Sequence, residues 1–382
     1  MLEDLVGLVS EHQPNALIIA GDIFDSPNPP AEAQRLFYQT LVRLHRACPS
    51  MTTVISAGNH DAANRLEAPR ALLAAIGVHV IGNVRRQNGV TLSSGHLIPI
   101  PSPSGELLGH VLTVSYPTAA CLPAVDGKRS LVTAVEELYR DLVSQTRAQW
   151  EGLPLVLTGH LHVAGSEVSE DSERPILIGG ENAIPANLFP TEAAYIALGH
   201  LHKPQRVGAE HIRYSGSLLP MSASEIDYKH GVALVEIAAT EVTVKHLPLA
   251  RPLAFHRVPR TGFASQAAVR GLLAELLITP GLVIDERPYV YLGLEREGLS
   301  PAFREELDRE AEELGLRILE IRLRDLPEAA TSLENAANPG LAVEDLDPSH
   351  FFELAFQRTH GKAPGPEHSV AFQLAYEESQ AI

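Results

Sequence analysis

Short apolar runs alternate with longer amphipathic stretches from the first residue to about residue 249. Residues 16–20 and 52–56 have the length and the apolar or β-branched character of buried strands. Each run ends in glycine and a polar loop, and a stretch with helical spacing follows, at 30–47 and at 67–76. Further short strands are predicted at 78–80, 90–92, 97–100, 111–115, 153–158 and 194–198. This alternation predicts an α/β fold.

The remaining elements complete two predicted domains. Residues 129–150 form a strong amphipathic helix pattern, and two antiparallel hairpins are predicted at 204–214 and 231–247. Residues 1–249 are therefore expected to form a sandwich of two mixed β-sheets flanked by helices. The pattern then resets, and residues 250–326 read as a compact β-α-β-α-β domain with the predicted elements 251–259, 264–277, 288–294, 301–314 and 316–323.

The last segment, 327–382, begins loosely and then predicts two helices, at 348–359 and 367–378. Phe351, Phe352 and Phe356 make the first of them too apolar for solvent. We expect this helical tail to dock on a partner protein. The alternative is that its aromatic side chains pack back on their own domain.

Composition narrows the class of protein. With 45% hydrophobic and 20% charged residues, the chain resembles an ordinary soluble globular protein, and its apolar runs are too short to span a membrane. Glu3, Asp4 and Glu11 stand where a secretory signal would need basic residues. Cys48 and Cys121 are too few for a disulfide framework, and neither is a catalytic candidate. A reduced, cytoplasmic setting is expected.

The net charge of −17 argues against non-specific nucleic-acid binding through a large basic surface. It does not exclude a nucleic-acid substrate, because bound metal ions can cancel carboxylate charge and clamp a phosphate. Part of the acidity lies in residues 295–313, where Arg304 and Arg309 interrupt eight acidic residues. That run is expected to form a solvated helix face.

Polar side chains follow four of the predicted strands. The phrases are Gly-Asp-Ile-Phe-Asp at 21–25, Gly-Asn-His-Asp at 58–61, and Gly-His-Leu-His at both 159–162 and 199–202. Ligands in α/β proteins bind at the carboxyl ends of the strands. The mixture of carboxylate, amide and imidazole donors suits a pair of divalent ions such as Mn²⁺, which can hold a phosphate ester for hydrolysis.

Each residue of the first two phrases has a candidate role. Asp22 suits a carboxylate that bridges two cations, although an aspartate there can also cap the next helix. Asn59 offers a neutral oxygen to the second metal. His60 can lie over the substrate, where it would stabilise developing charge or protonate the leaving oxygen. Asp25 can orient His60, whereas Asp61 either does so instead or forms a loop turn.

The histidines of the repeated phrase complete the candidate metal centre. A lone histidine at a strand end is usually structural, but His160, His200 and His202 occur together with a strand-end aspartate and asparagine. His200 and His202 can both point at one cluster if Leu201 turns into the core. His162 is the weakest member and is expected to be only a neighbour of the site.

Four stretches carry a family resemblance. They are Asp-Ile-Phe-Asp-Ser-Pro-Asn-Pro-Pro at 22–30, Gly-Asn-His-Asp at 58–61, Tyr-Ile-Ala-Leu-Gly-His-Leu-His at 195–202 and Tyr-Ser-Gly-Ser-Leu-Leu-Pro at 214–220. On these motifs the chain resembles the calcineurin-like metallophosphoesterases and, within them, the SbcD family of nuclease subunits. The resemblance covers essentially the whole chain.

The resemblance implies a function and a set of roles. The family acts as a Mn²⁺-dependent 3′→5′ exonuclease on double-stranded DNA and as an endonuclease on single strands or hairpins, in DNA repair and recombination. It implies that 250–326 is a capping domain and that 327–382 contacts an SbcC-type, SMC-like ATPase, with the nuclease as a homodimer. Asp22 would bridge two metal ions and His60 would act on the transition state, while the remaining ligands would be Asn59, His160, His200 and His202.

One family motif is missing from the sequence. The family opens with a strand and an Asp-x-His pair, and nothing before Asp22 supplies them. Residues 1–6 look like the helix that follows this motif, and His12 is expected in a loop, where it is no substitute. The first sheet would then lack a strand and the site two ligands. We expect a start codon placed too far downstream, and a truncated, inactive relative is the alternative.

Two rival functions follow from the same residues. The first is a phosphatase or cyclic-nucleotide phosphodiesterase that uses the same metals. The extra domain and the aromatic tail argue against it, because a small substrate requires neither. The second is a non-catalytic scaffold that keeps the tail but does not bind two metal ions.

Overall fold

The computed structural model describes seven stretches of the chain and a few residues of its tail. The stretches are 1–118, 120–123, 130–169, 183–238, 241–276, 282–296 and 301–324. In the tail the described residues are Phe352, Phe356, Gln357, 363–365, His368, Ser369 and Phe372.

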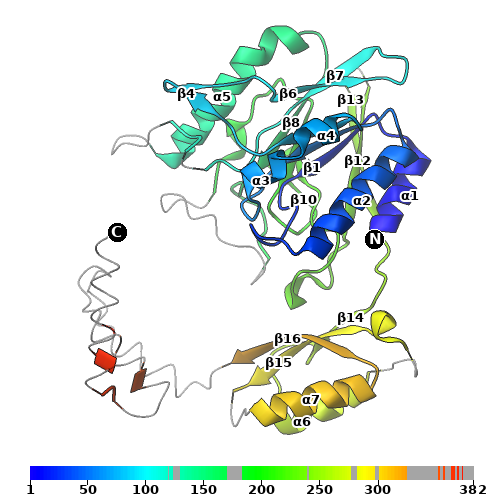
Figure 1. Cartoon of the computed structure of the whole chain (residues 1–382), viewed down its shortest axis with the longest axis vertical. Helices are drawn as coiled ribbons and strands as arrows, with labels where there is room; N and C mark the ends of the chain where they lie inside the picture. Colours follow the sequence, from blue (N-terminus) through cyan, green and yellow to red (C-terminus); the bar gives the residue numbers. More distant parts are fainter. Residues whose placement is uncertain are drawn as a thin grey trace.

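The elements up to Pro248 form the larger of two units, and a small parallel sheet is one of its layers (Figure 1). Its strands, in spatial order, are β1 (Ala16–Ala20), β2 (Thr52–Ser56) and β3 (Val78–Ile81). Among the described strands, β1 pairs with β2 alone. A shared apolar core joins this sheet to the helices α1 (Leu2–His12), α2 (Ala31–Ala47), α3 (Ala63–Glu67) and α4 (Arg70–Ala74).

Two sequence-based expectations are wrong in this layer. His12 is the last residue of α1 and not part of a loop. The single helix predicted at 67–76 is instead two short helices, because Pro69 has no N–H to continue the hydrogen-bond ladder and α4 begins directly after it.

A mixed six-stranded sheet forms the second layer. In spatial order its strands are β10 (Gln205–Val207), β11 (Ala209–Tyr214), β9 (Tyr195–Gly199), β8 (Leu155–His160), β7 (Leu107–Leu112) and β6 (Leu97–Pro101). The four central strands are parallel, and the two edge strands are antiparallel to their neighbours. Helix α5 (Leu131–Trp150) packs on this sheet with the buried Leu138, Tyr139 and Leu142.

The two sheets face each other across a small apolar layer. Val54 of β2 packs there with Ile98, Ile100 and Val111 of the second sheet. The predicted α/β sandwich is thus confirmed, although the smaller sheet is wholly parallel in the described residues. Two hairpins complete the unit, β4 (Arg86–Gln87) with β5 (Val90–Thr91) and β12 (Gly231–Ala238) with β13 (Glu241–Pro248). Short 3₁₀ turns occur at Ala186–Leu188, Ala223–Glu225 and Ile284–Glu286.

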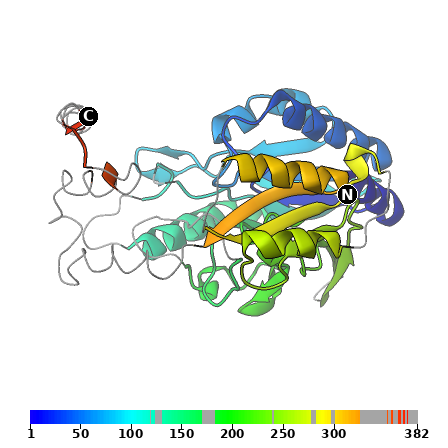
Figure 2. The same ribbon diagram turned by 90° about the horizontal axis from the view of Figure 1, so that it is seen from below.

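A second unit has the predicted β-α-β-α-β order and a core of its own. It comprises β14 (Phe255–Val258), α6 (Gln266–Ala274), β15 (Tyr289–Glu295), α7 (Pro301–Glu313) and β16 (Arg317–Arg324). All three strands are parallel, and Figures 1 and 2 show both helices on the face turned away from the larger unit. Tyr291 of β15 reaches the larger unit, where its hydroxyl lies 3.5 Å from the Pro220 carbonyl.

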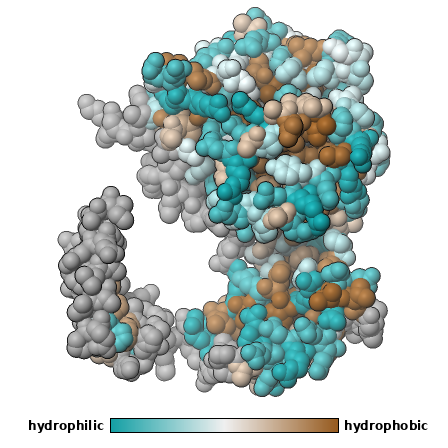
Figure 3. Space-filling model, viewed as in Figure 1, coloured by the Kyte–Doolittle hydropathy of each residue, from teal (hydrophilic) through white to brown (hydrophobic). Residues whose placement is uncertain are grey.

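The surface is mostly polar, and groups of apolar side chains lie on both units, the second one included (Figure 3). There β16 exposes Leu319 and Leu323. Helix α7 carries the part of the acidic run from Glu305 to Glu313 on a largely solvated face, whereas Glu295 ends β15. Cys48 and Cys121 are buried free thiols. Within the described residues, no helix is both long and apolar enough to cross a bilayer.

Most of the predicted docking tail, 327–382, lies outside the described residues. Of those that are described, Phe352 stacks on Phe372 with ring centroids 4.5 Å apart, and Phe356 lies 4.6 Å from the His368 ring. These contacts join aromatic side chains of the two predicted helices to each other. Docking of the tail on a partner stays a prediction.

Candidate functional site

The predicted site residues lie at the carboxyl ends of four strands drawn from both sheets. Asp22 follows β1, Asn59 follows β2, His160 ends β8 and His200 follows β9 directly. Because β1 contacts both β8 and β9, these four strand ends meet where the two sheets approach each other. The fold therefore gathers residues that are far apart in sequence.

Three of these side chains converge on one point. One ligand atom each from Asp22, His160 and His200 lies within 4.8 Å of the others. His160 Nε2 is 3.1 Å from Asp22 Oδ2 and 3.0 Å from Asn59 Oδ1, which brings a fourth predicted ligand to the same place. The structure thus brings together four of the five predicted metal ligands.

Glycines make this convergence possible. Gly21 has φ +91°, and a Cβ on it would lie 2.1 Å from His160 Nδ1. A Cβ on Gly199 would lie 1.6 Å from the Ala20 carbonyl oxygen. Each position therefore excludes every other residue type. Asp22 and His200 also have positive φ values, +50° and +99°, which are strained for residues with a side chain.

The orientation of His160 fits a cation. Its Nδ1 lies 2.7 Å from the Ala20 carbonyl, which can only accept, so Nδ1 carries the proton in this bond. The second nitrogen, Nε2, faces the oxygens of Asp22 and Asn59, to which it donates when protonated and presents its lone pair when not. A lone pair facing two oxygen acceptors is repulsive unless a proton or a metal ion lies between them. Two oxygens and two imidazoles form a donor set that suits a divalent transition metal such as Mn²⁺.

Electrostatics keep two of the ligands in the form that binds metal. Burial acts to raise the pKa of Asp22, but the hydrogen bond and charge of His160 and the His60 amide outweigh it and lower that pKa to about 2. Burial and the positive charge of His160 lower the pKa of His200 to about 3. At neutral pH Asp22 is therefore a carboxylate and His200 a neutral imidazole, as metal binding requires.

The lowered pKa of His200 predicts an acid-sensitive stability in the metal-free protein. The folded-state pKa, about 3, lies below the ordinary value of 6.5, so the unfolded chain binds this proton first. The stabilisation is complete above pH 6.5 and is lost as the pH falls towards 3, by up to roughly 1.4 kcal/mol per pH unit. We expect His200→Asn to flatten the curve of unfolding free energy against pH in this window, measured by urea unfolding with a chelator. Equal slopes for wild type and variant would contradict this.

His60 lies beside the cluster, and both its backbone amide and its Nδ1 make hydrogen-bond contacts. Its amide donates to Asp22 Oδ1 at 3.0 Å, and its Nδ1 lies 2.8 Å from the backbone carbonyl of Asp25. The Asp25 carboxylate is 3.8 Å away and its side chain is 94% exposed. Asp25 therefore lies at the ring nitrogen where the sequence-based role places it, with its main-chain carbonyl as the hydrogen-bond acceptor, and Nε2 is the ring atom left to face a substrate.

Asp61 ties the two site loops together. Its carboxylate accepts hydrogen bonds from the amides of Ile23, Phe24 and Gly58 at 2.8–3.1 Å. Burial raises the pKa of Asp61, against the lowering effect of these three amides. Of the two roles considered for Asp61, the structure supports the loop-forming one.

The second histidine of the last phrase has a partner that the sequence did not reveal. His202 Nδ1 lies 2.8 Å from Oε1 of the fully buried Glu225, whose Oε2 accepts the Met221 amide at 2.9 Å. This bond fixes the orientation of the His202 ring and leaves Nε2 as the ring atom that could bind a metal ion. Carboxylate partners of metal-bound histidines act in the same way. Glu225 is one of 47 acidic residues and belongs to no motif, so no sequence signal marked it.

His202 and His162 lie outside the three-residue group. Both are close enough to His200 for their charges to lower its pKa. His162 is thus a neighbour of the cluster, as predicted, and His202 stands beside it on the Glu225 side.

Replacing Glu225 is expected to damage both stability and metal affinity. Glu225→Ala leaves the His202 ring and the Met221 amide without this buried acceptor, which costs about 2 kcal/mol of unfolding free energy in urea. Loss of such a partner also weakens metal binding about 10- to 100-fold, which calorimetry with Mn²⁺ would measure. In nitrogen NMR the His202 ring would lose its fixed Nδ1–H tautomer. Glu241→Ala, at an exposed position on β13, is the matched control and should change none of these.

Comparison with known proteins shows the family of the chain. A family model described as calcineurin-like phosphoesterase matches residues 1–204. A Rhodobacter capsulatus protein named as the SbcD component of the nuclease SbcCD is 38% identical over 361 residues, which cover 93% of this chain and 88% of that protein. Proteins of the same name are 38% identical over 62% of the chain in Bacillus subtilis, covering 59% of that protein, and 29% identical over 91% in Escherichia coli, covering 88%.

Proposed function

The chain belongs to the calcineurin-like phosphoesterases and, within them, to the SbcD nucleases, and on that premise we propose that it degrades DNA. It is a metal-dependent phosphodiesterase of the nuclease type. The proposed activities are a Mn²⁺-dependent 3′→5′ exonuclease on double strands and an endonuclease on single strands or hairpins. The observation that carries the proposal is the convergence of Asp22, His160 and His200, with His60 beside them.

Some residues of the proposed site would bind the metal ions, and others hold the ligand side chains in the required orientation. Asp22 would contribute a carboxylate to the bound ions, and Asn59, His160, His200 and His202 would provide the other donors. Bound divalent ions would supply Lewis-acid stabilisation of the phosphoryl oxygens and a nucleophile from water at neutral pH. The Ala20 carbonyl and Glu225 hold the imidazoles of His160 and His202 in the tautomers that present Nε2.

His60 is proposed to handle the proton of the leaving group. The Asp25 carbonyl accepts from Nδ1–H and so keeps Nε2 directed away from that loop. A protonated Nε2 can donate to the leaving oxygen as the phosphorus–oxygen bond breaks. The contact between the His60 amide and Asp22 Oδ1 ties this imidazole to the metal-binding carboxylate.

We further propose the assembly in which the nuclease works. Residues 250–326 would be the capping domain beside the nuclease domain 1–249. The tail 327–382 would bind the coiled coil of an SbcC-type ATPase, with two copies of the nuclease in a heterotetramer. The setting would be the cytoplasm, and the process DNA repair and recombination. Co-purification of the chain with that ATPase, and its loss when 327–382 is removed, would test the assembly.

The function is tested on three substrates in the presence of Mn²⁺. End-labelled duplex DNA, a DNA hairpin and bis-p-nitrophenyl phosphate are incubated with the full chain, with and without a chelator. We expect chelator-sensitive cleavage of both DNAs, with duplex products that shorten from the 3′ ends. Strong hydrolysis of the small ester without DNA cleavage would favour the phosphatase or cyclic phosphodiesterase. No hydrolysis and no bound metal would favour the scaffold.

A further inference from the structure

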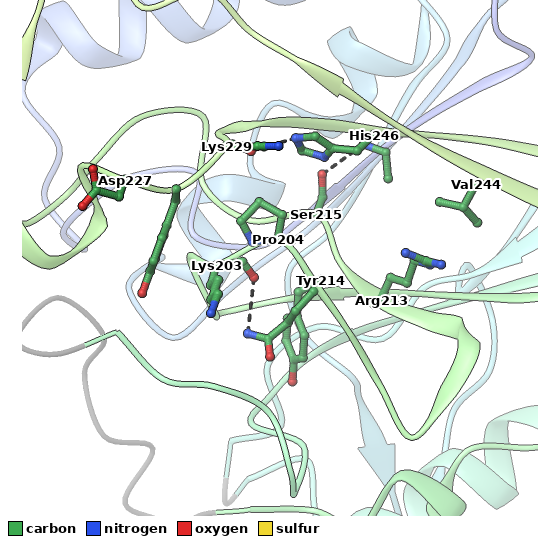
Figure 4. A pocket seen from close by; sticks show the side chains of 12 residues that line it. Lys203, Pro204, Arg213, Tyr214, Ser215, Asp227, Lys229, Val244 and His246 are labelled. Atoms are coloured by element: carbon green, nitrogen blue, oxygen red, sulfur yellow. Dashed lines mark hydrogen bonds between the residues drawn. The ribbon is translucent and has the colours of Figure 1, made fainter.

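A cavity of about 420 Å³ is lined in part by Lys203 and Pro204, which directly follow the candidate ligand His202 in the chain (Figure 4). It lies between the ends of β10 and β11 on one side and the β12–β13 hairpin on the other. Lys203, the residue after His202, lines the cavity, and the Ser217 amide donates to the His202 carbonyl at 3.0 Å. Lys229 lines the opposite side, four residues after Glu225. The cavity wall is thus continuous in sequence with both members of the His202–Glu225 pair.

Cationic side chains dominate the charge of this cavity. Lys203, Arg213 and Lys229 line it together with one carboxylate, that of Asp227 (Figure 4). Lys229 forms no ion pair with any described residue. Three cations around one cavity stand out in a chain whose net charge is −17. A polyanion would therefore find here a local attraction that the rest of the surface opposes.

Two of the cations have acidic partners that a ligand can replace. Lys203 pairs with Glu167, and Arg213 pairs with Glu210 at 2.8 Å. The cations are 32% and 27% exposed, whereas their glutamates are 70% and 68% exposed. The positive groups therefore belong to the cavity wall and the glutamates to the solvent. Such exposed pairs contribute little, so a phosphate can displace the glutamates at small cost.

An aromatic ring accompanies the cations. Lys203 Nζ lies 5.7 Å from the centroid of the Tyr228 ring, which also lines the cavity. Cations that follow a phosphate backbone, next to an aromatic ring on which bases can stack, are the pattern of single-strand binding grooves.

We propose that this cavity binds the phosphodiester backbone of one nucleic-acid strand next to the cleaved bond. This assignment rests on the proposed nuclease function and names the part of the substrate that the cavity holds. Lys203, Arg213 and Lys229 contact successive phosphates, and Tyr228 contacts a base or sugar. A strand seated there continues past His202 into the metal centre.

The test is the salt dependence of DNA binding by the full chain. A fluorescein-labelled single-stranded oligonucleotide is titrated with protein in a chelator, so that no cleavage occurs, and anisotropy gives the dissociation constant at several salt concentrations. We expect Lys229→Gln and Arg213→Gln each to weaken binding several-fold and to lower the slope of log affinity against log salt by roughly 0.7. Arg206→Gln is the matched control, because Arg206 also pairs with Glu210 but does not line the cavity.

The outcomes separate this proposal from the function on which it rests. Wild-type binding with unchanged slopes in both cavity variants would overturn the cavity assignment and leave the nuclease intact. A wild-type chain that binds no DNA would overturn both. Lys229→Gln is exposed and should fold normally, so it keeps the test valid if Arg213→Gln is unstable.

Discussion

Asp22→Asn is expected to lower Mn²⁺-dependent hydrolysis by about a thousandfold. The substitution removes the charge that the cluster presents to a cation, and loss of several kcal/mol of metal-based stabilisation corresponds to a factor of this size. Asparagine tolerates the positive φ of +50° at this position, and its oxygen can still accept the His60 amide. The backbone should therefore survive. Steady-state hydrolysis of bis-p-nitrophenyl phosphate would measure the loss of rate, and calorimetric Mn²⁺ titration the loss of metal affinity.

The matched control is Asp25→Asn, the same substitution three residues further along the same loop. The Asp25 side chain is almost fully exposed, and its carbonyl, not its carboxylate, lies within hydrogen-bond distance of His60 Nδ1. Its rate and metal affinity should stay within about twofold of wild type, since exposed substitutions of this kind have small effects. A wild-type rate in Asp22→Asn, or an equal loss in Asp25→Asn, would refute the assigned roles.

His60→Gln is expected to slow DNA cleavage by about 10²- to 10⁴-fold without weakening Mn²⁺ binding. General-acid catalysis contributes factors of this size, and its contribution grows as the leaving group becomes a poorer one. Hydrolysis of bis-p-nitrophenyl phosphate, whose leaving group needs little protonation, should therefore fall only a few-fold. The measurement compares turnover on both substrates at saturating metal. An equal loss on both substrates would show that His60 stabilises charge and does not donate a proton.

The first sheet shows why the fold could be predicted so closely. Strands β1 and β2 have the predicted ends, because each apolar run is bounded by residues that cannot continue it. In β8 the prediction ended two residues early, since Gly159 and His160 continue the strand despite their polar-loop character. Pro69 broke a helix that the apolar spacing had joined. Local pattern therefore predicted most elements, and errors arose where one residue changed the backbone geometry.

Some features of the candidate site could also be predicted from the sequence, and others could not. Asp22, Asn59, His160 and His200 could be predicted because each lies at a strand end, where the topology alone brings it to the others. The contact of His60 could not, since sequence does not tell whether an aspartate uses its side chain or its carbonyl. Glu225 was missed because its bond to His202 spans 23 residues and depends on the path of an irregular loop.

The hydrogen bond between His160 and the Ala20 carbonyl crosses from one sheet to the other, and so does the ligand cluster. An ion bound there would join the two layers as a crosslink. At one hundred times its dissociation constant, a ligand that binds only the folded state adds about 2.7 kcal/mol to stability. That energy would resist separation of the layers in particular, because opening either sheet destroys the cluster. Metal supply would therefore set whether the two sheets exchange amide protons as independent units or as one cooperative unit.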